Sequence, residues 1–249
     1  MSDTVVVITG ASSGIGAALA ERLAGQGMAV VLVARRADAL AQVQARCGEA
    51  ALTVVADVTR RADVQRVVDE ALARFGHIDV WVNNAGRGIT RPASELTDAD
   101  IDDMMLANVK SALYGVQAVL PHFKARGRGH LINVSSMLGR APIAGFRSAY
   151  NGAKHFLNAL TANLRDEVQA THPGIQVSLV SPGVVRTEFG VNAAYGGPDS
   201  RTLPNSQSAE EVAGVIAGVI ASRAPDVYTR PGARQMILDY LAALGQDPV

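Results

Sequence analysis

Short runs rich in valine, isoleucine and leucine alternate along the chain with longer segments of helical composition, and this alternation limits the fold more than any other feature. The short runs are apolar almost throughout, so a sheet made from them needs cover on both faces. Helices between successive strands provide that cover when the strands are parallel. We expect seven strands, at residues 5–9, 30–34, 52–56, 79–83, 131–134, 176–181 and 227–229.

The segments between these runs have the alanine and leucine content of helices. We expect helices near residues 15–25, 38–47, 60–75, 98–126, 150–170 and 209–222. Ser208 and Glu211 form a capping box ahead of the last helix, and Pro121 is expected to kink or end the fourth. No linker divides the chain. Residues 1–249 are therefore expected to form a single α/β domain, a doubly wound parallel sheet of Rossmann type with about seven strands and helices on both faces.

Charge and hydropathy argue against two classes of partner. The chain has 23 basic and 23 acidic residues, so it lacks the net positive charge that attracts nucleic acid or anionic membranes. The first residues lack the basic flank and long apolar region of a signal peptide. Residues 212–221 reach only about half of the roughly 20 residues that span a bilayer. We expect a cytoplasmic protein that binds neither nucleic acid nor membrane.

Cysteine and histidine usage argues against a metal site. Cys47 is the only cysteine, which excludes an intramolecular disulfide and suits a reducing compartment. The five histidines are scattered, and none has the spacing of a metal-binding pair. We therefore expect no catalytic metal.

A glycine-rich turn joins the first expected strand to the first expected helix, with the sequence Thr9-Gly10-Ala11-Ser12-Ser13-Gly14-Ile15-Gly16. Backbone N–H groups at such a turn can face a pyrophosphate, and glycine removes the side chains that would block its approach. We expect a dinucleotide cofactor to bind here, against Gly10, Ser12, Ser13, Gly14, Ile15 and Gly16.

The end of the second expected strand indicates which dinucleotide binds. An acidic residue at this place would bind the ribose 2′-hydroxyl of NAD, but Ala34 stands there and is followed by Arg35 and Arg36. Guanidinium groups make bidentate contacts with the additional phosphate of NADP. Asp38 is expected to cap the next helix instead of binding ribose. NADP(H) is therefore favoured, and NAD(H) is possible if the two arginines are incidental.

Tyr150 and Lys154 lie four residues apart in an expected helix, so the phenol and the ammonium share one face. A phenol with a pKa of about 10 is a weak acid near neutrality, and a nearby cation lowers that pKa. Ser135 and Ser136 follow the fifth expected strand, at the sheet edge where ligands bind. One of these hydroxyls can hold a substrate oxygen.

Together these motifs resemble the short-chain dehydrogenase/reductase family. The resemblance runs from residue 5 to about residue 187 and includes, in order, the glycine-rich turn, Asn83-Asn84-Ala85-Gly86, Asn108, the serine pair, Tyr150 with Lys154, and Pro182-Gly183. Tyr150 follows Ser136 one position later than in many members of the family, and the additional residue falls within 144–148.

The resemblance implies a role for each matched position. It selects Ser136 rather than Ser135, and it makes Asn108, Ser136, Tyr150 and Lys154 the catalytic residues. Besides the glycine-rich turn and the two arginines, the cofactor is expected to contact Asp57, Val58, Asn84, Ala85, Gly86, Tyr150, Lys154, Pro182, Gly183 and Thr187. Asn108 is expected to hold a water molecule that links Lys154 to solvent.

The expected function is hydride transfer between NADPH and a small carbonyl or alcohol substrate, with Tyr150 as general acid and base. Residues 183–207 are expected to shape the substrate pocket, but their sequence does not identify the substrate. The resemblance also implies a homodimer or homotetramer formed through residues 100–126 and 150–170. The alternatives are an NAD-linked alcohol or hydroxysteroid dehydrogenase and, in another class, a dinucleotide-binding sensor or scaffold without catalysis.

Overall fold

A computed structural model describes residues 4–245 of the chain, and its centre is one parallel sheet. The sheet has seven strands in the order β3-β2-β1-β4-β5-β6-β7, and every neighbouring pair is parallel. The expected doubly wound sheet is confirmed. The strands are β1 (Val5–Thr9), β2 (Ala29–Ala34), β3 (Ala51–Val55), β4 (Val80–Asn83), β5 (Gly129–Val134), β6 (Ile175–Ser181) and β7 (Asp226–Tyr228).

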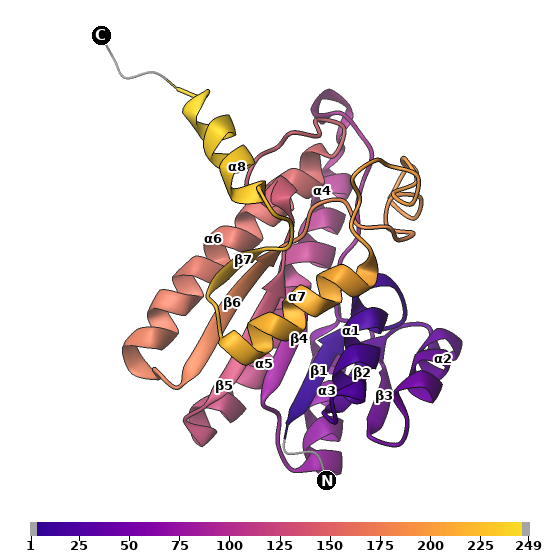
Figure 1. Cartoon of the computed structure of the whole chain (residues 1–249), viewed down its shortest axis with the longest axis vertical. Helices are drawn as coiled ribbons and strands as arrows, with labels where there is room; N and C mark the ends of the chain where they lie inside the picture. The colour runs from indigo at the N-terminus through magenta and orange to yellow at the C-terminus, as the bar shows by residue number, and fades with distance from the viewer. Residues whose placement is uncertain (1–3, 246–249) are drawn as a thin grey trace.

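Helices cover both faces of this sheet (Figure 1). They are α1 (Gly14–Gly25), α2 (Ala37–Cys47), α3 (Arg61–Phe75), α4 (Asp98–Met105), α5 (Ser111–Arg126), α6 (Ser148–Thr171), α7 (Ala209–Ser222) and α8 (Ala233–Ala242). Three short helical turns are η1 (Ala93–Glu95), the π-helical η2 (Leu106–Lys110) and η3 (Met137–Gly139). The helix α8 was not expected from the sequence.

The apolar strands separate two cores. Val6 and Ile8 of β1 pack with α1, α2 and α7, whereas Val5 and Val7 pack on the opposite face with α3, α5 and α6. Alternate side chains of a strand point to opposite faces, so a strand that is buried on both sides must be apolar at every position. This double burial explains the continuous apolar runs of the sequence.

Helix boundaries confirm one expectation, correct another and decide part of a third. The capping box at α7 is confirmed, because the Ser208 hydroxyl accepts a bond of 3.0 Å from the Glu211 N–H and the Glu211 carboxylate accepts one from the Ser208 N–H. Asp38 does not cap α2, which already begins at Ala37 after Arg36. The Asp38 carboxylate lies in the first turn of α2, where the positive end of the helix dipole stabilises its negative charge.

Pro121 does not end α5, which continues to Arg126. Val119 and Phe123 on either side of it are fully buried in the core. Their burial holds the last turn in place despite the backbone N–H that proline lacks.

Two features are absent from residues 4–245. No helix in this range is both long enough and apolar enough to cross a membrane. Over the same residues, no three His, Cys, Asp or Glu side chains gather in a way that could hold a metal ion.

Candidate active site

A cleft of about 1870 Å³ lies at the carboxyl ends of the strands. It is lined by the glycine-rich turn, the ends of β2 to β6, the first turns of α6 and the segment before α7, drawn in orange in Figure 1. Of the residues that the sequence indicated as functional, all but two line this cleft. The exceptions are Gly16 and Asn108.

The glycine-rich turn comes close to the end of β4. Gly10 and Gly14 have φ angles of +69° and +54°, in the left-handed region that favours glycine. A Cβ on Gly10 would lie 3.0 Å from the Ala85 Cα, and one on Gly16 would lie 2.3 Å from the Gly10 carbonyl oxygen. Gly16 therefore lets α1 pack against the turn, which explains why it does not line the cleft.

The first turn of α1 is available to an anion. Ser13 occupies its N-cap in an extended conformation, and its side chain makes no capping hydrogen bond. The first N–H groups of a helix have no partner within the helix, and the helix dipole adds positive potential there. Both features favour a phosphate at this end of the cleft.

Asn84 ties the end of β4 to the end of β1. Its Nδ2 donates to the Thr9 carbonyl over 2.9 Å, while the Thr9 hydroxyl accepts from the backbone N–H groups of Asn84 and Ala85 at 3.0 and 3.1 Å. The preceding Asn83 is buried below the cleft, where its Oδ1 accepts from the Trp81 indole over 2.7 Å. The two asparagines thus fix the backbone of this segment from two sides.

The two arginines after β2, Arg35 and Arg36, line the cleft. Arg36 Nη2 donates to the Ser12 and Ser13 hydroxyls at 3.4 and 3.3 Å, so the guanidinium lies beside the glycine-rich turn. Arg35 lies near Asp57. Burial raises the pKa of Asp57, but hydrogen bonds from Thr59 and the charges of Arg35 and Arg60 outweigh it, so the pKa lies below its ordinary value.

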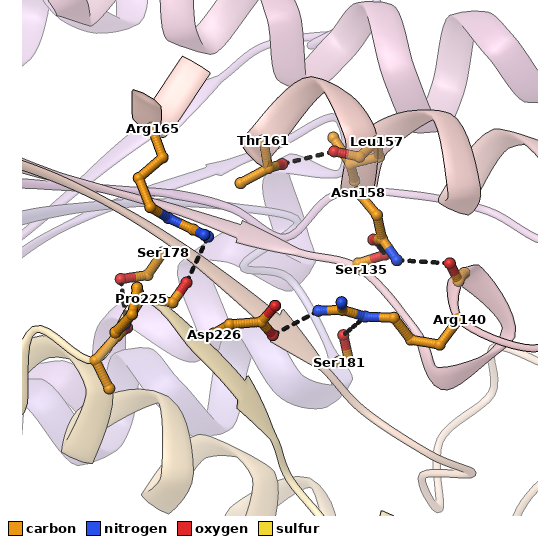
Figure 2. A network of polar contacts seen from close by, with 12 residues as sticks. Ser135, Arg140, Leu157, Asn158, Thr161, Arg165, Ser178, Ser181, Pro225 and Asp226 are labelled. Carbon is orange, nitrogen blue, oxygen red and sulfur yellow. Dashed lines mark hydrogen bonds and ion pairs between the residues drawn. The ribbon is translucent and has the colours of Figure 1, made fainter. Parts of the chain in front are cut away.

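The serine pair after β5 has two different environments. The Ser135 hydroxyl donates to Asn158 Oδ1 over 2.5 Å, and Figure 2 shows Asn158 extending from α6 toward Ser135. The Ser136 hydroxyl accepts from the Leu138 N–H over 3.1 Å and interacts with the Tyr150 phenol. The Ser135 hydroxyl therefore binds α6, whereas the Ser136 hydroxyl faces the Tyr150 phenol.

Tyr150 and Lys154 are both buried in α6. The Lys154 ammonium donates to the Val134 carbonyl over 3.0 Å and lies 5.7 Å from the centre of the Tyr150 ring. Burial lowers the pKa of Lys154 to about 8. Burial also raises the pKa of Tyr150 to about 12, although the Ser136 hydrogen bond and the charge of Arg147 act in the opposite direction.

Asn108 lies in the π-helical turn η2 and is buried. Its Nδ2 donates to the Arg87 carbonyl over 2.9 Å, and its Oδ1 accepts from the Arg87 N–H over 3.2 Å. A Cβ on Gly86 would lie 2.7 Å from Asn108 Oδ1 and 3.7 Å from Lys154 Nζ. Asn108 therefore lies behind Gly86 and holds the backbone that borders Lys154.

The segment after β6 closes the cleft from the other side. The Pro182 carbonyl accepts from the Met137 N–H over 2.8 Å, which joins this segment to η3. The Gly183 position lies near the Met137 sulfur. A Cβ on Gly14 would come within 3.0 Å of the Thr187 methyl group, so Thr187 lies against the glycine-rich turn.

Two residues beside Tyr150 were not identified from the sequence. Phe189 places its ring centre 5.5 Å from that of Tyr150, and the Arg147 guanidinium lies close enough for its charge to act on the phenol. Arg147 falls within 144–148, where the sequence has its additional residue. The sequence offered one signal that Arg147 lies near Tyr150. The two residues are three positions apart, and side chains with that spacing share a helix face.

The chain is similar to members of one known protein family. Residues 4–195 match the family described as short chain dehydrogenase. An uncharacterised oxidoreductase of Staphylococcus saprophyticus is 38% identical over 193 residues, which cover 76% of this chain and 77% of that protein.

Solved structures of similar architecture contain both forms of the cofactor. A short-chain dehydrogenase/reductase from Burkholderia phymatum in complex with NAD is 26% identical, with a TM-score of 0.88 over 100% of this chain and 98% of the other. A short-chain dehydrogenase from Sphingobium yanoikuyae in complex with NADPH is 32% identical, with a TM-score of 0.82 over 99% and 98% of the two chains.

Proposed function

This chain belongs to the short-chain dehydrogenase family, and from that premise we propose that it transfers hydride between NADPH and the carbonyl or alcohol carbon of a small molecule, with Tyr150 as general acid and base. One observation carries the proposal. Tyr150 and Ser136 interact in the same cleft that the glycine-rich turn lines, with Lys154 beside them.

The residues of the cleft fit a dinucleotide. Gly10 lacks the Cβ that would meet Ala85, and the first turn of α1 has free donors for a pyrophosphate. At the adenosine end, Arg36 and the hydroxyls of Ser12 and Ser13 form one polar group that suits the 2′-phosphate of NADP. The bound cofactor would supply or accept the hydride.

The side chains around Tyr150 have separate roles in the proposed reaction. Ser136 holds the substrate oxygen by donating a hydrogen bond, and the Tyr150 Oη donates a proton to the oxygen as the carbonyl is reduced. Because burial raises the pKa of the phenol, Tyr150 keeps that proton at neutral pH. Lys154 has N–H groups left for ribose hydroxyls after donating to Val134. Asn108 acts as a positioning residue for the segment around Gly86.

The variant Tyr150→Phe tests this proposal. A general acid contributes about 10²- to 10⁴-fold to a rate, so kcat should fall by that order while NADPH affinity changes little. NADPH oxidation against a panel of ketones, aldehydes and quinones measures the first quantity, and NADPH fluorescence titration measures the second. Tyr114→Phe is the control, because Tyr114 stacks on Arg61 away from the cleft. Turnover of Tyr150→Phe at the wild-type rate would refute the role of the phenol.

The two alternatives predict different results in the same assays. An NAD-linked alcohol or hydroxysteroid dehydrogenase would use NADH at least as well as NADPH. A sensor or scaffold would bind the dinucleotide, and no member of the panel would be turned over. Cofactor preference and turnover therefore separate the three functions.

A further inference from the structure

Arg147 is a buried cation without an ionic partner. Only 7% of its surface is exposed, and no acidic side chain within residues 4–245 pairs with it. Its one side-chain hydrogen bond is a long contact of 3.4 Å to the Ile89 carbonyl. By contrast, the guanidinium of Arg87 at the same cleft lies 2.6 Å from the Asp103 carboxylate.

An unpaired buried guanidinium is costly. A guanidinium stays protonated in proteins and has five N–H donors, and leaving a charge buried without a partner destabilises the fold. Burial lowers the pKa of Arg147, and the charge that Tyr150 carries when it is ionised acts against that shift. An anion that enters the cleft would supply the missing partner.

The charge of the Arg147 guanidinium acts on the Tyr150 phenol. Arg147 and Tyr150 line the same cleft. A Cβ on Gly88 would be 2.9 Å from Arg147 Nη1 and 3.0 Å from the Phe189 ring, so both side chains meet over this glycine. The Phe189 ring in turn lies 5.5 Å from the Tyr150 ring. A ligand whose carbonyl reaches Tyr150 therefore has a cation and an aromatic wall beside it.

We propose that Arg147 binds a carboxylate of the substrate, so that the protein acts on keto acids and the corresponding hydroxy acids. The inference rests on the proposed function and names its substrate class. A single guanidinium matches the geometry and the single charge of a carboxylate. Arg87, which precedes Gly88 in the chain, is already paired with Asp103 and is not available to the same ligand.

The reaction leaves the carboxylate unchanged. In the reducing direction, the carbonyl carbon takes up hydride from NADPH and the carbonyl oxygen takes up the Tyr150 proton, which yields the hydroxy acid and NADP⁺. The phenol then regains a proton from solvent. Arg147 acts only by binding, so its loss should affect acids and spare neutral carbonyls.

Matched pairs of acid and ester test this inference. NADPH oxidation is measured with acetoacetate, levulinate and phenylglyoxylate and with the methyl ester of each. For at least one pair, the wild type should prefer the acid in kcat/KM by roughly 10- to 100-fold, the effect of a charge-assisted hydrogen bond. Arg147→Met should remove that preference by raising KM for the acid, and Arg147→Lys should keep part of it.

Arg87→Met is the matched control, because it removes a guanidinium of the same cleft that is already ion-paired. It should keep the preference for the acid. Thermal unfolding shows whether each variant is folded, and Arg147→Gln replaces Arg147→Met if the latter is not.

Three results would overturn the inference. The wild type could reduce esters as well as acids, or Arg147→Met could keep the preference. Arg147→Met could also lose activity equally on acid and ester with a shifted pH profile, which would mean that Arg147 acts only through Tyr150. If the wild type turns over no carbonyl at all, the proposed function fails. Calorimetric binding of levulinate and its methyl ester to the NADP⁺ complex then decides the inference separately.

Discussion

Two cations lie near the phenol of Tyr150, and their surroundings differ. Lys154 donates to the Val134 carbonyl from a buried position, whereas Arg147 has only a long bond to the Ile89 carbonyl. The sequence suggested Lys154 as the cation that acidifies the phenol. Burial raises the Tyr150 pKa in the structure, and a Ser136 hydrogen bond and the charge of Arg147 act against that rise. The effect of Lys154 on the phenol stays a prediction.

The buried ammonium of Lys154 makes stability depend on pH. Burial lowers its pKa from 10.5 to about 8, so between these values the unfolded chain holds a proton that the folded chain has released. The free energy of unfolding therefore rises with pH in this window, by about 1.4 kcal/mol per unit at most. Urea unfolding between pH 7.5 and 9.5 should show a slope in the wild type that Lys154→Met lacks. Equal slopes in the two proteins would contradict this prediction.

The predicted preference for NADPH over NADH depends on Arg36. Arg36→Ala removes the guanidinium beside Ser12 and Ser13, so KM for NADPH should rise roughly 10- to 100-fold while KM for NADH changes little. Steady-state kinetics with both cofactors measure the effect. Arg74→Ala, an exposed arginine of α3 outside the cleft, is the control. The preference for NADPH would be refuted if both cofactors lost affinity equally.

At the scale of elements, local geometry places the functional groups. The π-helical turn η2 separates α4 from α5 and carries Asn108, whose amide holds the Arg87 backbone. The segment of η3 joins the end of β5 to the end of β6 through the Met137 N–H and the Pro182 carbonyl. Short irregular turns between regular elements thus set the walls of the cleft.

Two substitutions, one at the N-cap of α7 and one inside the helix, should change the free energy of unfolding in opposite directions. Ser208→Ala removes the hydroxyl that accepts from the Glu211 N–H and should cost about 1 kcal/mol. Gly218→Ala lies inside the helix, where a Cβ would meet no atom within 4 Å, and should stabilise the protein by about 1 kcal/mol. Urea unfolding measures both. Shifts in the same direction would mean that tertiary contacts of α7, not its local helix energetics, decide the effect.

At the scale of the whole molecule, exposed apolar side chains support the proposal of a homodimer or homotetramer. Phe156 on α6 is 51% exposed and Ile101 on α4 is 47% exposed, both within the segments expected to associate. Light scattering should give the mass of two or four chains. Phe156→Glu should shift that mass toward one chain and leave NADPH binding intact. A single-chain mass for the wild type would contradict the proposal.

Local patterns were sufficient for the sheet and for much of the cofactor cleft. The apolar runs that became β1, β2, β4, β5 and β6 reflect burial on both faces, and the turn after β1 needs glycine at positions 10 and 14 because of its backbone angles. Each of these signals is contained in a few consecutive residues. Asp38 shows their limit, because α2 begins one residue before it and Arg36 occupies the N-cap position. Of the two outcomes expected at Pro121, the structure excludes the end of the helix, since α5 continues to Arg126.

Contacts between distant segments were decided only by the tertiary structure. The hydrogen bond between Ser135 and Asn158 and the place of Arg147 beside Gly88 and Phe189 join residues that are far apart in the sequence. The sequence alone therefore determined which segments form the strands, most of the helices and the glycine-rich turn, because hydrophobic period and backbone angles are local properties. The folded sheet decided which side chains surround the Tyr150 phenol. Parallel crossovers bring loops together that are separated by long and irregular stretches of sequence.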